Sequence, residues 1–261
     1  MQTELDKAHA AMEVAPESDA ARLAFYARLA DCELFLLLKH EAEGEAIEPE
    51  IAEIEGISYV FGFDAEERLV EFAAQAAPYA VLSGRALAGL LNGQGVGLGV
   101  NAGVAPSSIL LPPEAVAWLA ETLAGTPEED AGALAAVRPP ELAEAVLAAL
   151  EAKLARAGGL VRAACLAGVT YGDGREGHLL AFLGAVPGVE AALAKAVSEA
   201  LVFSGLEEGA LDVAFFAGDA ALAARLAAVG LRFDLPEPAA EEVQVPGAAP
   251  GMDKGKPPIL K

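Results

Sequence analysis

Residues 93–108 read GQGVGLGVNAGVAPSS, and the spacing of glycine in this stretch decides how the first half of the chain is interpreted. Glycine occupies every second position from Gly93 to Gly99. In a β-strand, alternate residues share one face, so one side is bare and the other is hydrophobic, lined by Val96, Leu98 and Val100. A bare face lets a backbone or an aromatic ring approach closely. The stretch therefore predicts a core strand.

The alternative for this stretch is a phosphate-binding loop. A dinucleotide fingerprint requires G-x-G-x-x-G directly after a strand and at the start of a helix, with an acidic residue about 20 positions later. The strict period of two does not fit that spacing, and no GK[ST] follows it, which excludes a Walker loop. We therefore favour the strand and expect no cofactor.

Strand and helix signals alternate around this stretch, from about residue 32 to 123. Ser18 precedes a helical pattern, and Asp64 with Glu67 predicts a capping box at the start of a helix that ends before Pro78. Pro112 suits the first turn of another helix. Apolar runs predict strands over residues 33–38, 57–63 and 79–84, and a short helix over 84–93.

The second half of the chain shows the order ββαβαβ behind a leading helix. Pro139 opens an amphipathic helix over residues 139–157, and two apolar strands surround a Gly-Asp-Gly turn. Further helices start near Pro187 and after Asp219, and each is separated from the next by a strand. A capping box of Thr126 and Glu129 predicts one more helix before this half.

These patterns predict an α+β fold with two domains, each a mixed β-sheet packed with helices. The expected N-terminal domain covers residues 1–124, a linker covers 125–138, and the C-terminal domain covers 139–235. From Pro236 onward, proline, glycine, alanine and acidic residues dominate, so residues 236–261 are interpreted as a flexible tail.

The net charge and the hydropathy of the chain limit the classes of partner that it can bind. The net charge of −22 disfavours binding to nucleic acid or to an anionic membrane. The longest apolar runs are far shorter than the ~20 residues of a membrane span, and residues 1–13 lack a signal sequence. We expect a cytoplasmic protein in which Cys32 and Cys165 act as small buried hydrophobic residues. The acidic run Glu41–Glu55 is interpreted as a solvated excursion, with a docking patch as the alternative.

One anion-binding candidate stands out. Ser83, Gly84 and Arg85 lie where a strand ends and a helix begins, so backbone N–H groups, the helix dipole and one guanidinium could hold a carboxylate or phosphate. The simpler interpretation, which we favour, is an N-cap serine beside an exposed arginine.

The remaining polar groups predict no catalytic and no metal site. The histidines are isolated, Ser107-Ser108 has no local base, and Trp118 is interpreted as a core residue. Three polar residues share a glycine-rich hairpin turn and are interpreted as a turn rather than as ligands of a divalent ion: Asp173, Glu176 and His178.

The end of the tail is a candidate partner-binding element. Residues 256–261 read KPPILK, in which Pro257, Pro258, Ile259 and Leu260 form a compact apolar unit beside basic residues. The alternative is a frayed terminus.

Three segments together resemble the SseB family, the enhanced serine sensitivity proteins: FYARLADCELFLLL, PYAVLSGRALAGLL and GVGLGVNAGVAPSSILLPPEAVAWL. The resemblance covers roughly residues 18–123, and the ββαβαβ half is similar to the C-terminal domain of the family. It implies a bacterial, cytoplasmic protein with no established catalytic activity, named for an effect on tolerance of serine.

The leading hypothesis is a non-enzymatic interaction or regulatory protein that contacts a protein partner or a second copy of itself. The helix over residues 139–157 would bury one face between domains or protomers, and the tail would dock as a tethered peptide. One alternative is a sensor that binds an amino acid or an anionic metabolite near Ser83–Arg85. The other is a hydrolase or transferase whose groups converge from distant segments.

Overall fold

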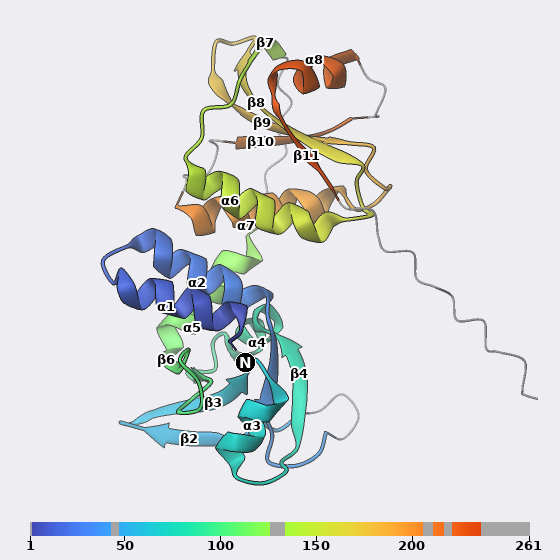
Figure 1. Cartoon of the computed structure of the whole chain (residues 1–261). Coiled ribbons are helices and arrows are strands. Elements are labelled where there is room, and N and C mark those ends of the chain that lie inside the picture. Colours follow the sequence, from blue (N-terminus) through green and yellow to red (C-terminus); the bar gives the residue numbers. More distant parts are fainter. Residues whose placement is uncertain (1, 43–46, 126–133, 206–210, 217–220, 236–261) are drawn as a thin grey trace, which may run out of the picture.

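The chain folds around two β-sheets, each with helices packed against it (Figure 1). The structure is a computed structural model that describes residues 2–42, 47–125, 134–205, 211–216 and 221–235. Its helices and two mixed sheets confirm the predicted α+β class.

The N-terminal sheet has six strands in the order β4-β1-β3-β5-β6, and β2 pairs with β3 beside β1. Only β3 and β5 pair in parallel, and the other pairs are antiparallel. The strands are β1 (Glu33–Leu37), β2 (Ile51–Ile54), β3 (Ile57–Phe63), β4 (Tyr79–Ser83), β5 (Gly97–Val100) and β6 (Ile109–Leu111).

The glycines of β5 allow the close contacts that their spacing predicts. A Cβ on Gly97 would lie 2.4 Å from the Tyr59 ring and 2.6 Å from the carbonyl oxygen of Leu111. A Cβ on Gly99 would lie 2.7 Å from the Phe61 ring. The core strand is therefore confirmed from Gly97 onward. The preceding glycines lie before the strand, where a left-handed turn uses their positive φ values: Gly93 and Gly95.

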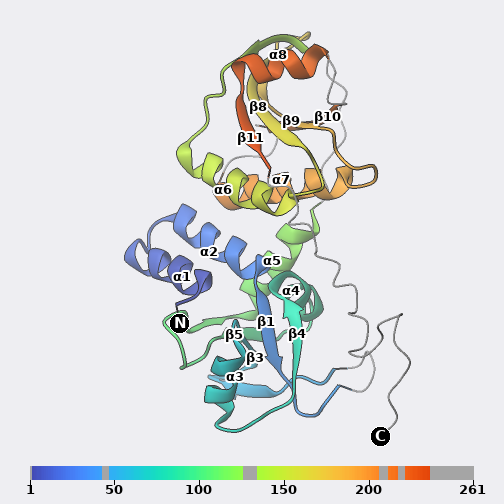
Figure 2. The same ribbon diagram turned by 45° about the vertical axis from the view of Figure 1, so that its right-hand side comes forward.

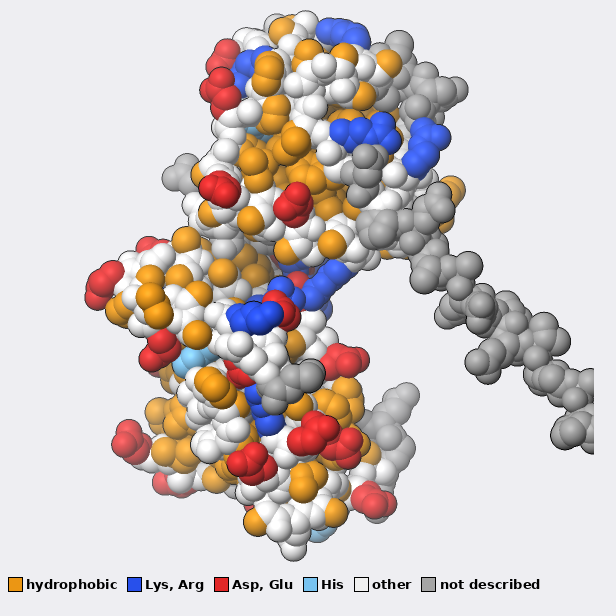
Figure 3. All heavy atoms as spheres, viewed as in Figure 1, with side chains coloured by type: hydrophobic (Ala, Val, Ile, Leu, Met, Phe, Trp, Pro, Cys, Tyr) orange, Lys and Arg blue, Asp and Glu red, His pale blue; other side chains and the backbone are white. Residues whose placement is uncertain are grey.

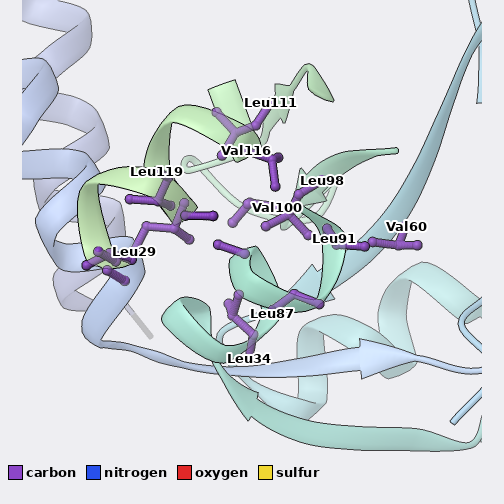
Figure 4. Packing of buried hydrophobic residues seen from close by; sticks show 14 of the residues in the cluster. Leu29, Leu34, Val60, Leu87, Leu91, Leu98, Val100, Leu111, Val116 and Leu119 are labelled. Carbon is purple, nitrogen blue, oxygen red and sulfur yellow. The ribbon is translucent and has the colours of Figure 1, made fainter. Parts of the chain in front are cut away.

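One face of the N-terminal sheet carries the main core, to which every helix of this half except α3 contributes buried residues (Figure 4). Leu34, Val60 and Leu98 project from the strands toward Leu87 and Leu119 on the helices. The opposite face, called the outer face here, is partly covered by α3. The helices are α1 (Glu4–Val14), α2 (Asp19–Asp31), α3 (Glu66–Ala73), α4 (Gly84–Leu91) and α5 (Pro113–Ala124).

The start of α3 differs from the prediction. Ala65 is the N-cap residue and makes no side-chain cap, so the capping box of Asp64 and Glu67 is wrong. The Asp64 carboxylate instead accepts a hydrogen bond from Arg68, one turn into the helix, at 2.6 Å. A charged partner makes the stronger hydrogen bond, which is why the side chain turns away from the backbone N–H groups.

The C-terminal sheet has the order β10-β9-β8-β11, and β7 pairs with β8 beside β11. β9 and β10 are parallel, and the other pairs are antiparallel. Helices α6 and α7 cover one face and α8 lies against the other. The elements are β7 (Leu134–Arg138), α6 (Glu144–Leu154), the 3₁₀ helix η1 (Ala155–Ala157), β8 (Ala163–Tyr171), β9 (Glu176–Leu183), α7 (Glu190–Ser204), β10 (Leu211–Phe216), α8 (Ala221–Val229) and β11 (Leu231–Asp234).

The segment around residue 138 is built differently from the predicted linker and helix. Residues 134–138 form β7, which pairs with β8, so they belong to the C-terminal sheet rather than to a linker. The helix begins at Glu144 instead of Pro139, because the chain must first pass from the sheet edge to the face that the helix covers. The capping box of Thr126 and Glu129, and the cap at Asp219, lie outside the described residues.

The two halves pack through helices. α7 lies against α2 and α5 (Figure 2), and its Phe203 is buried in the core cluster of the N-terminal half.

Cys165 is fully buried, and burial raises the pKa of the Cys32 thiol to about 12, which agrees with the predicted apolar role of both cysteines. Among the described helices, none has the length and apolar character needed to cross a bilayer.

Candidate functional site

Strand β4 has an open edge. The Leu38 N–H donates to Pro78 O (3.0 Å) and the Gly84 N–H donates to Cys32 O (2.9 Å), which places the even-numbered residues of this segment in hydrogen bonds to β1. In an antiparallel pair these bonds alternate, so the N–H and C=O groups of Tyr79 and Val81 point to the other side. Within the described ranges no strand pairs with that side of β4 (Figure 1).

The outer face of β4 is apolar and exposed. Directly paired residues share a face, so the pairs Phe35–Val81 and Leu37–Tyr79 lie on the same side as the core-forming Phe61 of β3. Tyr79 is 38% exposed and Val81 is 47% exposed, and the Tyr79 ring packs edge-on against Phe35 with centroids 5.2 Å apart. An apolar strip of this kind along an unpaired strand is a ready template for another extended segment.

Acidic side chains flank this strip. Glu33 pairs with Ser83 across β1 and β4 on the outer face, and Glu66 and Glu71 are exposed on α3. The Glu66 carboxylate raises the pKa of the Tyr79 phenol, mainly through its charge and also through a hydrogen bond. Figure 3 shows acidic side chains gathered over α3 and β4 on the face in view. We call the surface of Phe35, Tyr79 and Val81 with these three acids the β4 face.

The predicted anion site lies instead at the junction of the two halves. The Arg85 guanidinium donates to both carboxylate oxygens of Glu199 on α7, at 2.6 and 2.9 Å, and to Asp31 at the end of α2, at 3.1 Å. Two carboxylates of the chain thus occupy the donors that an external anion would need. The predicted binding of an anion at this arginine would have to displace one of them.

The other two residues of that prediction are structural. Ser83 is the N-cap of α4, and its hydroxyl accepts a hydrogen bond from the Ala86 N–H at 3.2 Å, as the simpler interpretation expects. Gly84 lies so close to α2 that a Cβ would stand 1.9 Å from the carbonyl oxygen of Leu29. Glycine is required here for helix packing, because any side chain would overlap the backbone of α2.

The ion pairs at the junction form one network that connects helices of the N-terminal half with helices of the C-terminal half. Lys153 of α6 donates to Asp31 at 2.7 Å and to Glu199 at 3.3 Å, and Arg156 contacts Asp31 at 2.7 Å. We call these residues, with Arg85, the junction network. Figure 3 shows basic and acidic side chains close together between the two halves. Burial raises the pKa of Asp31 and of Glu199, but the ion pairs lower it by more, so both pKa values lie below their usual range.

Trp118 lies where α5 meets α2 and α7 and not in the core, so the prediction of a core position is wrong. The side chain is 39% exposed and packs edge-on against Tyr26 of α2 at 5.1 Å and against Phe203 of α7 at 6.3 Å, measured between ring centroids. The helical pattern of α5 identified its apolar face correctly, but α7 covers only part of that face.

A second polar cluster is buried inside the N-terminal half, and sequence analysis did not predict it. Asp6 is 1% exposed and accepts from the Arg68 guanidinium at 2.5 and 3.1 Å and from the Ser107 hydroxyl at 2.6 Å. Asn101 donates to Ser107 at 2.8 Å. Burial raises the pKa of Asp6, but the hydrogen bonds with Arg68, Ser107 and the backbone of Thr3 hold it far below its usual range.

This buried cluster ties α1 to the sheet. Thr3 caps α1, and its hydroxyl also donates to Asp64 at 2.6 Å. Asp64 and Asn101 follow the two parallel strands, a position where ligands often bind in open sheets. Here the chain's own groups satisfy them, and no described buried side-chain nitrogen or oxygen lacks a hydrogen-bond partner. The only local signal in the sequence was the capping box of Thr3 and Asp6.

The histidines and the hairpin turn do not converge. His9 packs edge-on against Phe25, and His178 Nε2 accepts a hydrogen bond from the Glu141 N–H at 3.2 Å. In the turn, the Asp173 carboxylate accepts from the backbone N–H of Arg175 at 2.9 Å, as the turn interpretation expects. No cluster of His, Cys, Asp and Glu suited to a metal ion occurs in the described parts of the chain.

Two sequence predictions reach beyond the described residues. The tail with Pro257, Pro258, Ile259 and Leu260 lies outside them. The acidic run Glu41–Glu55 is described except at residues 43–46, and its end forms the exposed strand β2, which the sequence interpretation missed.

These observations define an α+β protein with two mixed sheets, in which β4 lies at the edge of the N-terminal sheet as the structure describes it. Residues 5–118 match the family model for the SseB protein N-terminal domain, which supports the resemblance to the SseB family over this part of the chain. The match covers the whole N-terminal sheet. The resemblance of the C-terminal half to that family remains a prediction. Comparisons with curated proteins and with solved structures gave no significant match.

Proposed function

We propose that this chain is a non-enzymatic, cytoplasmic interaction protein that binds an extended segment of a protein partner along β4, and that it contributes in this way to the serine-sensitivity effects for which its family is named. The observation that carries the proposal is the exposed strip of Tyr79 and Val81 on an edge strand. Strand addition to a sheet edge takes its affinity from main-chain hydrogen bonds and its specificity from alternate side chains.

The pKa values of the buried carboxyl groups support the non-enzymatic part of the proposal. A catalytic acid or base has a pKa shifted toward neutrality. Asp6, Asp31 and Glu199 are instead held ionised by arginine or lysine, with pKa values below their usual range. Carboxylates held in such ion pairs are better suited to positioning helices than to accepting a proton near neutral pH.

The charge around β4 indicates the chemistry of the partner. The acids of the β4 face surround an apolar strip, so the segment that fits combines aliphatic side chains with lysine or arginine. A second copy of this chain fits less well, because each copy carries a net charge of −22 and would bring the same acids to the contact.

Selection from a displayed library of random 12-residue peptides tests the proposal. We expect enriched peptides to contain aliphatic and basic residues and to lose at least tenfold in affinity when Val81 is changed to Lys. The matched control is Leu110→Lys on β6, at the other edge of the sheet, where the side chain is 39% exposed. Peptides that bind both variants equally, or that mass spectrometry shows to be chemically altered by the protein, would contradict the proposal.

A further inference from the structure

The β4 face has a matching segment within the same chain. We propose that residues 257–261 add to β4 as an antiparallel strand of their own molecule and cover the β4 face until a partner displaces them. This inference rests on the proposed function, because it assigns an occupant to the same surface. Its consequence is that partner binding is competitive with an internal ligand.

Charge complementarity is the first argument. Residues 252–261 contain three lysines and one aspartate, in a chain with a net charge of −22. Glu33 and Glu66 lie at the apolar strip of the β4 face, and Glu71 is exposed on α3, which packs on the same side of the sheet. Opposite charges at the rim of a contact increase the rate of association and select the orientation.

Register is the second argument. If Ile259 lies opposite Val81, an antiparallel strand places Lys261 opposite Tyr79 and therefore beside Glu66, which already interacts with the Tyr79 phenol. The same register places Pro257 opposite Ser83, at the end of β4. Proline lacks an N–H and is tolerated at the first position of a strand. The hydrogen bond that Pro257 cannot donate would therefore be missing only where the pairing starts.

Side-chain alternation is consistent with this register. Ile259 would share the outer face with Val81, which is exposed, and with Phe35, which is partly buried. Leu260 would turn to the other face, beside Ala80 and Leu82, which are only partly buried at the margin of the main core. Both aliphatic residues of the segment would therefore contact apolar partners.

The reach of the chain is sufficient. The described chain continues to Leu235, after β11, which runs toward the N-terminal half (Figure 1). About 20 residues separate this point from Pro257, and a flexible linker of that length has a root-mean-square span of roughly 25 Å and a maximum of about 70 Å. A compact chain of this size has a radius of gyration of about 18 Å, so β4 lies within range.

Hydrogen exchange of the full chain tests the inference. The amides of Tyr79 and Val81 have no partner strand among the described residues, so they should exchange rapidly unless the segment covers them. We expect these amides to exchange at least tenfold faster in Ile259→Asp than in the unmodified chain. Leu90→Asp on α4, which is also an exposed aliphatic residue, is the control and should leave the rate at β4 unchanged.

A peptide experiment separates this inference from the proposed function. The synthetic peptide KGKPPILK, which is residues 254–261, should restore slow exchange at β4 when added to Ile259→Asp, and Val81→Lys in the same chain should prevent it. Equal exchange rates in the unmodified chain and in Ile259→Asp would overturn the inference. If library peptides still bind at β4 in that case, the proposed function stands; if neither the library nor this peptide binds, both fail.

Discussion

Arg85 and Glu199 lie 114 positions apart in the sequence and form a bidentate ion pair, with Nη1–Oε1 at 2.6 Å and Nη2–Oε2 at 2.9 Å. Arg85 belongs to α4 of the N-terminal half and Glu199 to α7 of the C-terminal half. The planar guanidinium donates one hydrogen bond to each carboxylate oxygen, which restricts the orientation of the two groups. The pair therefore defines how the two halves are oriented, while Phe203 supplies the apolar part of the contact.

Removing the charge of Glu199 should weaken this contact. Glu199→Gln keeps the shape of the side chain but leaves Arg85 and Lys153 with Asp31 as their remaining carboxylate in the junction network. We expect the free energy of unfolding in urea to fall by about 2–3 kcal/mol, because partly buried cations lose a partner.

The control for that variant is Asp19→Asn, which breaks an exposed pair with Arg22 on one helix. Its expected cost is below about 0.5 kcal/mol. Equal losses in the two variants would show that the junction network contributes no more than a surface ion pair.

Stability should depend on pH through the same network. The pKa values of Asp31 and Glu199 are lower in the folded chain than in the unfolded chain, where they are about 3.9 and 4.3. Their contribution is therefore fully present above about pH 5 and is lost as the pH falls through the folded-state values. Urea unfolding between pH 2 and 7 should give a flatter profile for Asp31→Asn combined with Glu199→Gln. Parallel profiles would refute this role.

A methyl group in β5 should be strongly destabilising. Gly97→Ala would place a Cβ against Tyr59 and the Leu111 carbonyl, where overlap forces backbone movement, at a cost of about 3 kcal/mol or more. Gly89→Ala on α4 is the matched control, because nothing lies within 4 Å of its Cβ. Alanine favours the helix by about 1 kcal/mol, so thermal unfolding should shift upward for Gly89→Ala and downward for Gly97→Ala.

Trp118 should report the contact between the halves, since it is the single tryptophan of the chain. Phe203→Ala removes a ring that packs against it, so we expect the fluorescence maximum to move to longer wavelength and the stability to fall by about 3 kcal/mol. The control Phe72→Ala alters the outer face, where Phe72 packs on Phe61 and Phe63, and should leave the emission wavelength unchanged. An unshifted spectrum in Phe203→Ala would show that Trp118 does not sense this contact.

Local patterns predicted the regular elements that have strong periodicity. The alternating glycines identified β5, and Ser18 marked the start of α2 by a real cap, accepting from the Ala21 N–H at 3.2 Å. Two of the strands that were not predicted carry weak local signals. β2 lies in an acidic run, and β7 reads LAAVR, a composition with little β-propensity. These strands form because each pairs with a neighbouring strand, β2 with β3 and β7 with β8.

The sequence by itself determined the α+β class, the core role of the glycine-spaced strand, the N-cap at Ser83 and the chemistry available in the tail. These features depend on neighbouring residues, whose preferences are expressed within one strand or one helical turn. Only the tertiary structure decided that Arg85 meets Glu199 and that β4 lies at the edge of the sheet formed by the described strands. Both depend on which distant segments lie side by side, and the order of strands in a sheet and the packing of helices are set by the burial of the whole chain.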